Sequence, residues 1–398
     1  MLIIMMVFFI FAGNFLAFPF ASRLKFQLLF YNVFCFFVFV SCFSYLFEFV
    51  ALDIEAAFFL LTVNFTLFFI LSVVDLCLTF KRKLITKRGL STFDYLISLF
   101  LISAVVIEIY SKLHEYSIIH IFSNVLRDDF INAYLLYFLI FFTAYLFYNG
   151  ESKLDMFLSI FCLFLCFLLG VKGIVLLILF VYIIRQLDSK FDTKSIMKLI
   201  IICSVGIVSF YSSYVVPRVL FEGEHLLDVI YDINQRFIFY SASGVLSFSI
   251  DYANGVDMNN ISSLYVPFYN GYVNIFDSGS EKASYMVNII NSLSISGFGS
   301  YSNVKTLYGT IFLNSGNYKL LNFFVFFVFN VFLIVFRRLF NQRFKYTNTA
   351  LTMYLACLLI SWFEFYYWHA FLLYGVIYAV ILDFFACCIA RKFTISYR

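Results

Sequence analysis

The chain has 398 residues, of which 63% are hydrophobic and 13% charged, and its formal net charge is +4. With a mean hydropathy of +0.95, this composition excludes a soluble globular protein and is typical of a polytopic membrane protein. The nine cysteines lie in or beside apolar runs, so neither a disulfide framework nor a zinc pattern is expected.

Eleven apolar runs along the chain predict membrane spans. They are expected at about 2 to 20, 27 to 47, 56 to 80, 93 to 110, 132 to 148, 154 to 169, 173 to 185, 197 to 215, 319 to 336, 347 to 361 and 369 to 389. The sixth and seventh runs are short, and they form a down-and-back pair if the turn between them lies below the membrane surface. We therefore predict an all-α polytopic fold with about 11 transmembrane helices.

Basic residues determine the expected orientation. If successive spans cross the membrane in opposite directions, 19 of the 27 Lys and Arg residues fall on one side. The positive-inside rule identifies that side as cytoplasmic. The stretch from Met1 to Phe20 has no basic n-region and is expected to be a span, not a cleaved signal. Three regions are expected: a membrane bundle of about eight spans at 1–215, a large outer segment at 216–318 and about three spans at 319–398.

The outer loop before the fifth span carries Arg127, followed by Asp128 and Asp129. The two carboxylates are well placed to cap the next helix and to interact with its N-terminal dipole. Alternatively, Arg127 and the acids form a charged site at the membrane surface, where the preceding apolar residues predict an interfacial helix. Arg127 is therefore a candidate substrate-binding residue.

Lys172 stands between two apolar runs, with Gly170 and Gly173 close by. A lysine at membrane depth is costly unless it reaches the interface or faces an aqueous cavity or an anion. Two alternatives follow: Lys172 extends to the outer interface, or the open turn that its glycines permit presents the ammonium group to a phosphate.

The segment from Val216 to Tyr318 lies between apolar runs, but it holds 9 of the 16 glycines and 2 of the 3 prolines. Titratable residues near its start recur at helical spacing, so they are expected to share or neighbour one face of an amphipathic helix that ends near Tyr240. These residues are Arg218, His225, Asp228, Asp232 and Arg236. Arginine suits bidentate phosphate contacts; the alternative is a solvated helix whose Asp and Arg residues pair four positions apart.

Turn-forming pairs are frequent from Gly244 to Gly299, and tyrosines lie among them. Tyrosine offers a planar apolar face with a hydroxyl tip, which suits packing on a pyranose ring, so Tyr269 is a candidate sugar contact. An ordinary loop-rich domain is the alternative. The segment from 216 to 318 carries four cations and eight acids, which makes nucleic acid and long polyanions poor partners.

Late in the segment, residues 299–304 read Gly-Ser-Tyr-Ser-Asn-Val, and Tyr-Gly follows at 308–309 before an aromatic-rich span. Together with about eleven spans, one large late outer loop and a Gly-x-Lys turn at the outer end of a mid-chain helix, this pattern resembles the Wzy-type O-antigen polymerases. By this resemblance, Lys172 stands where such proteins commonly have Arg or Lys, and Asn303 and Gly309 lie in the late-loop motif. Lys172 is not Arg, which weakens the argument for a bidentate phosphate clamp there.

The resemblance implies a fold like that of GT-C glycosyltransferases and glycosyl transfer at the periplasmic face of a bacterial inner membrane. The substrates would be repeat units linked to undecaprenyl pyrophosphate, and a flippase and a chain-length regulator would be partner proteins. Arg218 and Arg236, followed by Lys172 and Arg127, would stabilise charge on the departing pyrophosphate. No cofactor is implied, and no outer carboxylate pattern predicts a metal ion.

The base that takes the acceptor proton would be one of Asp228, Asp232, His225 and Glu224. An O-antigen ligase is an alternative, because it would share the large outer loop and the lipid-pyrophosphate donor. A flippase would normally have more spans, and a membrane O-acyltransferase would carry its His and Arg within the spans or at their cytoplasmic ends. A structural role is least favoured, because cations at the membrane edge are expensive to keep without use.

Overall fold

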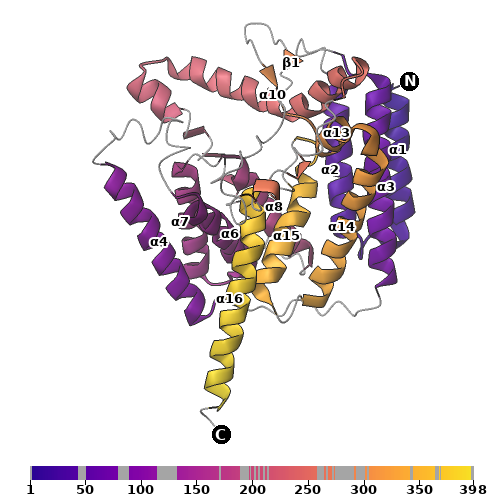
Figure 1. Ribbon diagram of the computed structural model, residues 1–398. Coiled ribbons are helices and arrows are strands. Elements are labelled where there is room, and N and C mark those ends of the chain that lie inside the picture. The colour runs from indigo at the N-terminus through magenta and orange to yellow at the C-terminus, as the bar shows by residue number, and fades with distance from the viewer. Residues whose placement is uncertain are drawn as a thin grey trace. The chain divides into compact units, whose positions relative to one another are not determined.

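A computed structural model (Figure 1) describes residues 2–43, 51–78, 89–113, 132–169, 172–188, 215–257, 304–340, 344–363 and 369–395, with single residues and short pieces between them. Helices dominate this part of the chain. Its strands are one antiparallel pair, β1 (Asn291–Ser292) and β2 (Tyr301–Ser302). The chain divides into two compact units that each combine segments distant in sequence. The expected division at residues 215 and 318 stays a prediction.

The first unit comprises Met1–Phe80, Arg236–Phe336 and Cys357–His369. Its first three long helices pack against one another (Figure 1). They are α1 (Leu2–Ala17), which is followed by the short η1 (Phe18–Phe20), α2 (Lys25–Cys42) and α3 (Ile54–Cys77). Asp53 is the N-cap of α3, and its carboxylate accepts a hydrogen bond from the Ala56 N–H at 2.8 Å. The short helix α13 (Leu307–Asn314) packs against α3.

The second unit comprises Lys81–Gln235, Arg337–Ala356 and Ala370–Arg398. Helix α6 (Ala133–Asn149) is central to it, because every residue from Leu139 to Asn149 is buried. A helix that is apolar and buried on all sides needs neighbours all round. These neighbours are α4 (Thr92–Leu113), α7 (Lys153–Leu168), α8 (Lys172–Asp188) and α16 (Ala370–Ile395).

Six helical segments are long and apolar enough to cross a membrane, and α6 is apolar but shorter. The six are Ile3–Phe20, Lys25–Cys42, Ile54–Cys77, Thr92–Ser111, Gly316–Phe340 and Ala370–Cys388. On α1, Phe11 and Phe15 are 70% and 80% exposed, which suits a lipid-facing surface. The all-α, multi-pass membrane character is therefore confirmed.

Three of the helices expected to be spans are short. The expected runs at 319–336 and 347–361 correspond to α14 (Lys319–Phe340), which follows the short η5 (Gly316–Tyr318), and to α15 (Lys345–Leu359). Helices α7, α8 and α15 have 16, 17 and 15 residues, which is short for a span. The run expected at 197–215 lies mostly outside the described residues. The count of eleven spans therefore stays a prediction.

Helix α10 (Leu226–Ala253) differs from the helix expected between Arg218 and Tyr240. It begins eight residues after Arg218 (226 − 218), and it continues through Gly244, where turns were expected. Gly244 is needed for close packing, because a Cβ there would lie 2.6 Å from the Phe363 carbonyl oxygen. A turn does form at Asn254–Gly255, one of the turn-forming pairs in this stretch, with Gly255 at φ +64°.

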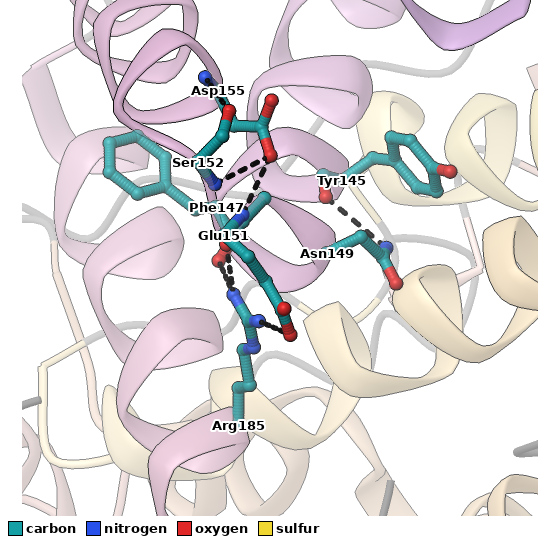
Figure 2. A network of polar contacts seen from close by, with 8 residues as sticks. Tyr145, Phe147, Asn149, Glu151, Ser152, Asp155 and Arg185 are labelled. Carbon is teal, nitrogen blue, oxygen red and sulfur yellow. Dashed lines mark hydrogen bonds and ion pairs between the residues drawn. The ribbon is translucent and has the colours of Figure 1, made fainter. Parts of the chain in front are cut away.

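A polar network joins helix ends that the expected topology places together on the cytoplasmic side. From the last turn of α8, Arg185 Nη1 donates to the carbonyl oxygens of Phe147 at 3.0 Å and Gly150 at 2.8 Å (Figure 2). Its Nη2 lies 3.4 Å from Glu151, and Asp155 accepts the Glu151 N–H at 2.7 Å. The end of α8 therefore meets the residues just before α7, as expected of a down-and-back pair.

Candidate functional site

Arg218 is the centre of a charged cluster just before α10. It lies in a π-helical turn, η4 (Val216–Phe221). Its Nε and Nη2 donate to the two carboxylate oxygens of Glu224 at 2.9 and 2.5 Å, and Nη2 also donates to Asp232 at 2.7 Å. The pairing with Glu224 is bidentate, the geometry that best orients a guanidinium. The loop between them turns at Gly223, where φ is +71°.

The cluster contains one cation and two acids, all partly exposed. The side chains of Arg218, Glu224 and Asp232 are 21%, 35% and 24% accessible. Hydrogen bonds from Arg218 hold the pKa of Glu224 below its usual value. The same bonds, first with Glu224 and then with Asp232, raise the pKa of Arg218. Arg218 is thus fully charged, with three donor contacts already made inside the cluster.

The other residues expected on this helix face are distributed along α10. His225 and Asp228 are exposed at its start, where the Asp228 N–H donates to the His225 carbonyl oxygen at 3.1 Å. Arg236 is also exposed, but it belongs to the first unit. The structure therefore brings Arg218, Asp232, Asp228 and His225 to one end of the helix.

Lys305 forms a buried ion pair in the first unit. Its Nζ lies 2.6 Å from Asp251 Oδ2, and the two side chains are only 5% and 1% accessible. Nζ also donates to the Ser247 hydroxyl at 2.5 Å and to its carbonyl oxygen at 3.3 Å. Burial lowers the pKa of Lys305, and the interactions with Asp251 oppose that shift. The buried Lys305–Asp251 ion pair therefore joins α10 to the residues just before α13, and Lys305 is not a surface cation.

Gly309, expected in a substrate-binding motif, is packed inside the first unit. A Cβ at this position would lie 2.6 Å from the ring of Phe248. Its N–H donates at 2.9 Å to the hydroxyl of Thr306, the N-cap of α13, and the neighbouring Tyr308 hydroxyl donates to Asn64 at 3.0 Å. The structure thus assigns Gly309 a packing role.

The remaining predicted residues are less fully placed. Lys172 is the first residue of α8, at the outer end that the topology predicts. Tyr269 is 43% exposed in a short described piece. Arg127 and Asn303 lie outside the described residues. Within the described part of the chain, no group of three or more His, Cys, Asp and Glu side chains could hold a metal ion.

A cavity in the second unit was not expected from the sequence. It is lined by Glu108 on α4, by Tyr134 and Phe138 on α6 and by Tyr378 on α16. The sequence signal that could have indicated it is Glu108 itself, an acid near the outer end of the run expected at 93 to 110.

No family model, curated protein or solved structure matches this chain.

Proposed function

We propose that this chain polymerises oligosaccharide repeat units linked to undecaprenyl pyrophosphate, by glycosyl transfer at the periplasmic face of a bacterial inner membrane. The observation that carries the proposal is the Arg218 cluster. It is an oriented guanidinium with carboxylates around it, at the start of a helix that is not among the six membrane-crossing candidates. Such a group suits a lipid-carried anion at a membrane surface.

The first requirement of the reaction is stabilisation of the leaving group. Negative charge develops on the pyrophosphate as its bond to the donor sugar breaks, and a fixed cation lowers that barrier. Glu224 and Asp232 occupy Nε and Nη2 of Arg218. In the proposal, the Nη1 edge donates to a phosphate oxygen, and the two carboxylates hold the guanidinium in position.

The second requirement is a base. The acceptor hydroxyl oxygen forms a bond to the anomeric carbon of the donor while the bond from that carbon to the pyrophosphate oxygen breaks. The proton of the hydroxyl passes to Asp228 or His225, which are exposed beside the cluster. Either side chain needs only to reach the hydroxyl with a suitable pKa. Arg236 and Lys172 remain the further candidate cations.

The proposal is tested by complementing a deletion strain with variants at matched membrane levels. Arg218→Ala should shorten the polysaccharide chains strongly, because loss of one such electrostatic contact costs about 10²–10³ in rate. Arg218→Lys should recover only part of the length, since lysine cannot make the bidentate contact. Lys153→Ala, an exposed change on the expected cytoplasmic side, is the matched control.

A purely structural role for Arg218 gives a different result. In that case Glu224→Gln, which breaks the same ion pair but keeps the guanidinium, would shorten the chains as much as Arg218→Ala. The proposal expects Glu224→Gln to retain longer chains than Arg218→Ala.

A further inference from the structure

The cavity in the second unit lies where three helices meet. It is a depression that is largely open to the surroundings, has a volume of about 580 Å³ and is lined by the end of α4, the start of α6 and the first half of α16. The expected topology places Glu108 and Tyr134 near the outer end of their spans and Tyr378 near the middle of the span at 369 to 389. The volume is within the range of about 300–1,000 Å³ that small-molecule sites have.

Two hydrogen bonds shape this cavity. Glu108 Oε1 accepts the Asn132 N–H at 2.8 Å, which joins α4 to the residue that caps α6. The Tyr378 hydroxyl donates to the Tyr134 carbonyl oxygen at 2.9 Å, which joins α16 to α6. One carboxylate and one aromatic ring are thereby held at the wall.

The aromatic rings form a continuous group around this wall. Tyr134 meets Tyr374 edge to face, with ring centroids 5.0 Å apart, and Phe138 meets Tyr378 in the same way at 5.0 Å. Tyr137 stacks on Tyr374 at 5.6 Å. Tyr134 is itself 51% exposed, so part of this aromatic surface is open to a ligand.

The chemistry of the wall selects the class of ligand. Glu108 is the one charged side chain among the lining residues that the structure describes, and these include no Lys or Arg. A carboxylate accepts hydrogen bonds from hydroxyl groups, and tyrosine rings present apolar faces with polar tips. A sugar ring has the complementary surfaces, namely hydroxyl donors around its edge and C–H groups on its faces.

We infer that this cavity binds an uncharged sugar ring of the lipid-linked glycan. The Glu108 carboxylate accepts a hydrogen bond from a sugar hydroxyl, and the rings of Tyr134 and Tyr378 pack against the sugar. The assignment to the glycan of this reaction rests on the proposed function. Binding of a sugar can be measured independently of it.

The test is saturation-transfer difference NMR on the purified full chain in detergent micelles. The probes are the methyl glycosides of glucose, galactose and N-acetylglucosamine. Ring protons of at least one probe should receive saturation from the wild-type protein. Glu108→Gln should weaken binding about tenfold, because it replaces a charged acceptor by a neutral amide oxygen. Tyr134→Ala should weaken it several-fold.

Matched controls keep the result specific. Glu55→Gln makes the same chemical change at an exposed acid in the first unit, and Tyr110→Ala removes a ring that is 63% exposed and does not line the cavity. Both should bind the probes as the wild type does. Equal saturation in Glu108→Gln, Tyr134→Ala and the wild type overturns the inference, and so does no saturation at all. Transfer to tetramethylammonium in place of the sugars also overturns it, because the cavity would then be a cation site.

The failure of this inference differs from the failure of the proposed function. If the probes bind but the deletion strain keeps its normal polysaccharide, the cavity is a sugar site and the polymerase proposal is wrong. If the deletion strain loses long chains but no probe binds, the polymerase proposal stands and the cavity assignment falls.

Discussion

Replacement of Lys305 by methionine should strongly destabilise the first unit. The substitution keeps most of the side-chain length and removes the ammonium group. It leaves the Asp251 carboxylate, which is 1% accessible, without its counter-charge. Removing one partner of a buried pair costs about 3–5 kcal/mol, and that is the loss expected in the free energy of unfolding.

A second substitution separates the charge effect from packing. In the double variant Lys305→Met with Asp251→Leu, both charges are gone, and apolar replacements of buried pairs are often neutral or stabilising by about 1–4 kcal/mol. The double variant should therefore regain most of the stability that Lys305→Met loses. A double-mutant cycle gives the coupling between the two residues.

The assay is unfolding of the purified chain in mixed micelles by titration with dodecyl sulfate, followed by circular dichroism. The control is Lys319→Met, because Lys319 lies 3.3 Å from Asp257 in a pair that is 33% and 38% accessible. Together with its position over the Phe312 ring, this exposed pair is worth about 1–2 kcal/mol. The reasoning is refuted if Lys305→Met costs no more than Lys319→Met, or if the double variant is as unstable as the single one.

Three further predictions concern single residues. Gly309→Ala should cost about 1–3 kcal/mol in the same unfolding assay, since the new Cβ would overlap the buried Phe248 ring; unchanged stability would contradict the packing role. Arg185→Met should cost about 2–4 kcal/mol, because its contacts to two carbonyl oxygens and a carboxylate are lost; a loss below about 1 kcal/mol would argue against this network. Because Arg218 lowers the pKa of Glu224, that carboxylate stabilises the fold above its unfolded pKa, and the contribution is lost as pH falls through the lowered folded value. The thermal midpoint should therefore fall less between about pH 7 and about pH 3 in Glu224→Gln than in the wild type, and equal falls would contradict the assignment.

The helix positions could be predicted because apolar runs bounded by charged residues carry a strong local signal. The runs expected at 56 to 80 and 93 to 110 correspond to α3 and α4, with ends that differ by a few residues. The end of α10 was predicted wrongly for a physical reason. Gly244 and the serines around it are typical of turns, but here a glycine and small side chains allow other segments to pack close to the helix.

The site was only partly predictable. The grouping of Arg218, His225, Asp228 and Asp232 could be predicted because charged residues at helical spacing are a local pattern, although Arg218 lies before the helix. The ion pair between Lys305 and Asp251, which are 54 residues apart (305 − 251), depends on tertiary packing. No pattern in the local sequence predicts it. The same holds for Glu108, whose place in the cavity wall follows only from the packing of α4, α6 and α16.

The most direct test of the central claim is a gel of surface polysaccharide from a source strain that lacks this gene, with and without the wild-type chain. The account predicts that the deletion leaves a single repeat unit on the lipid core and that the wild-type chain restores a ladder of many repeats. A deletion that leaves no repeat on the core would contradict it, because that phenotype belongs to a ligase or a flippase.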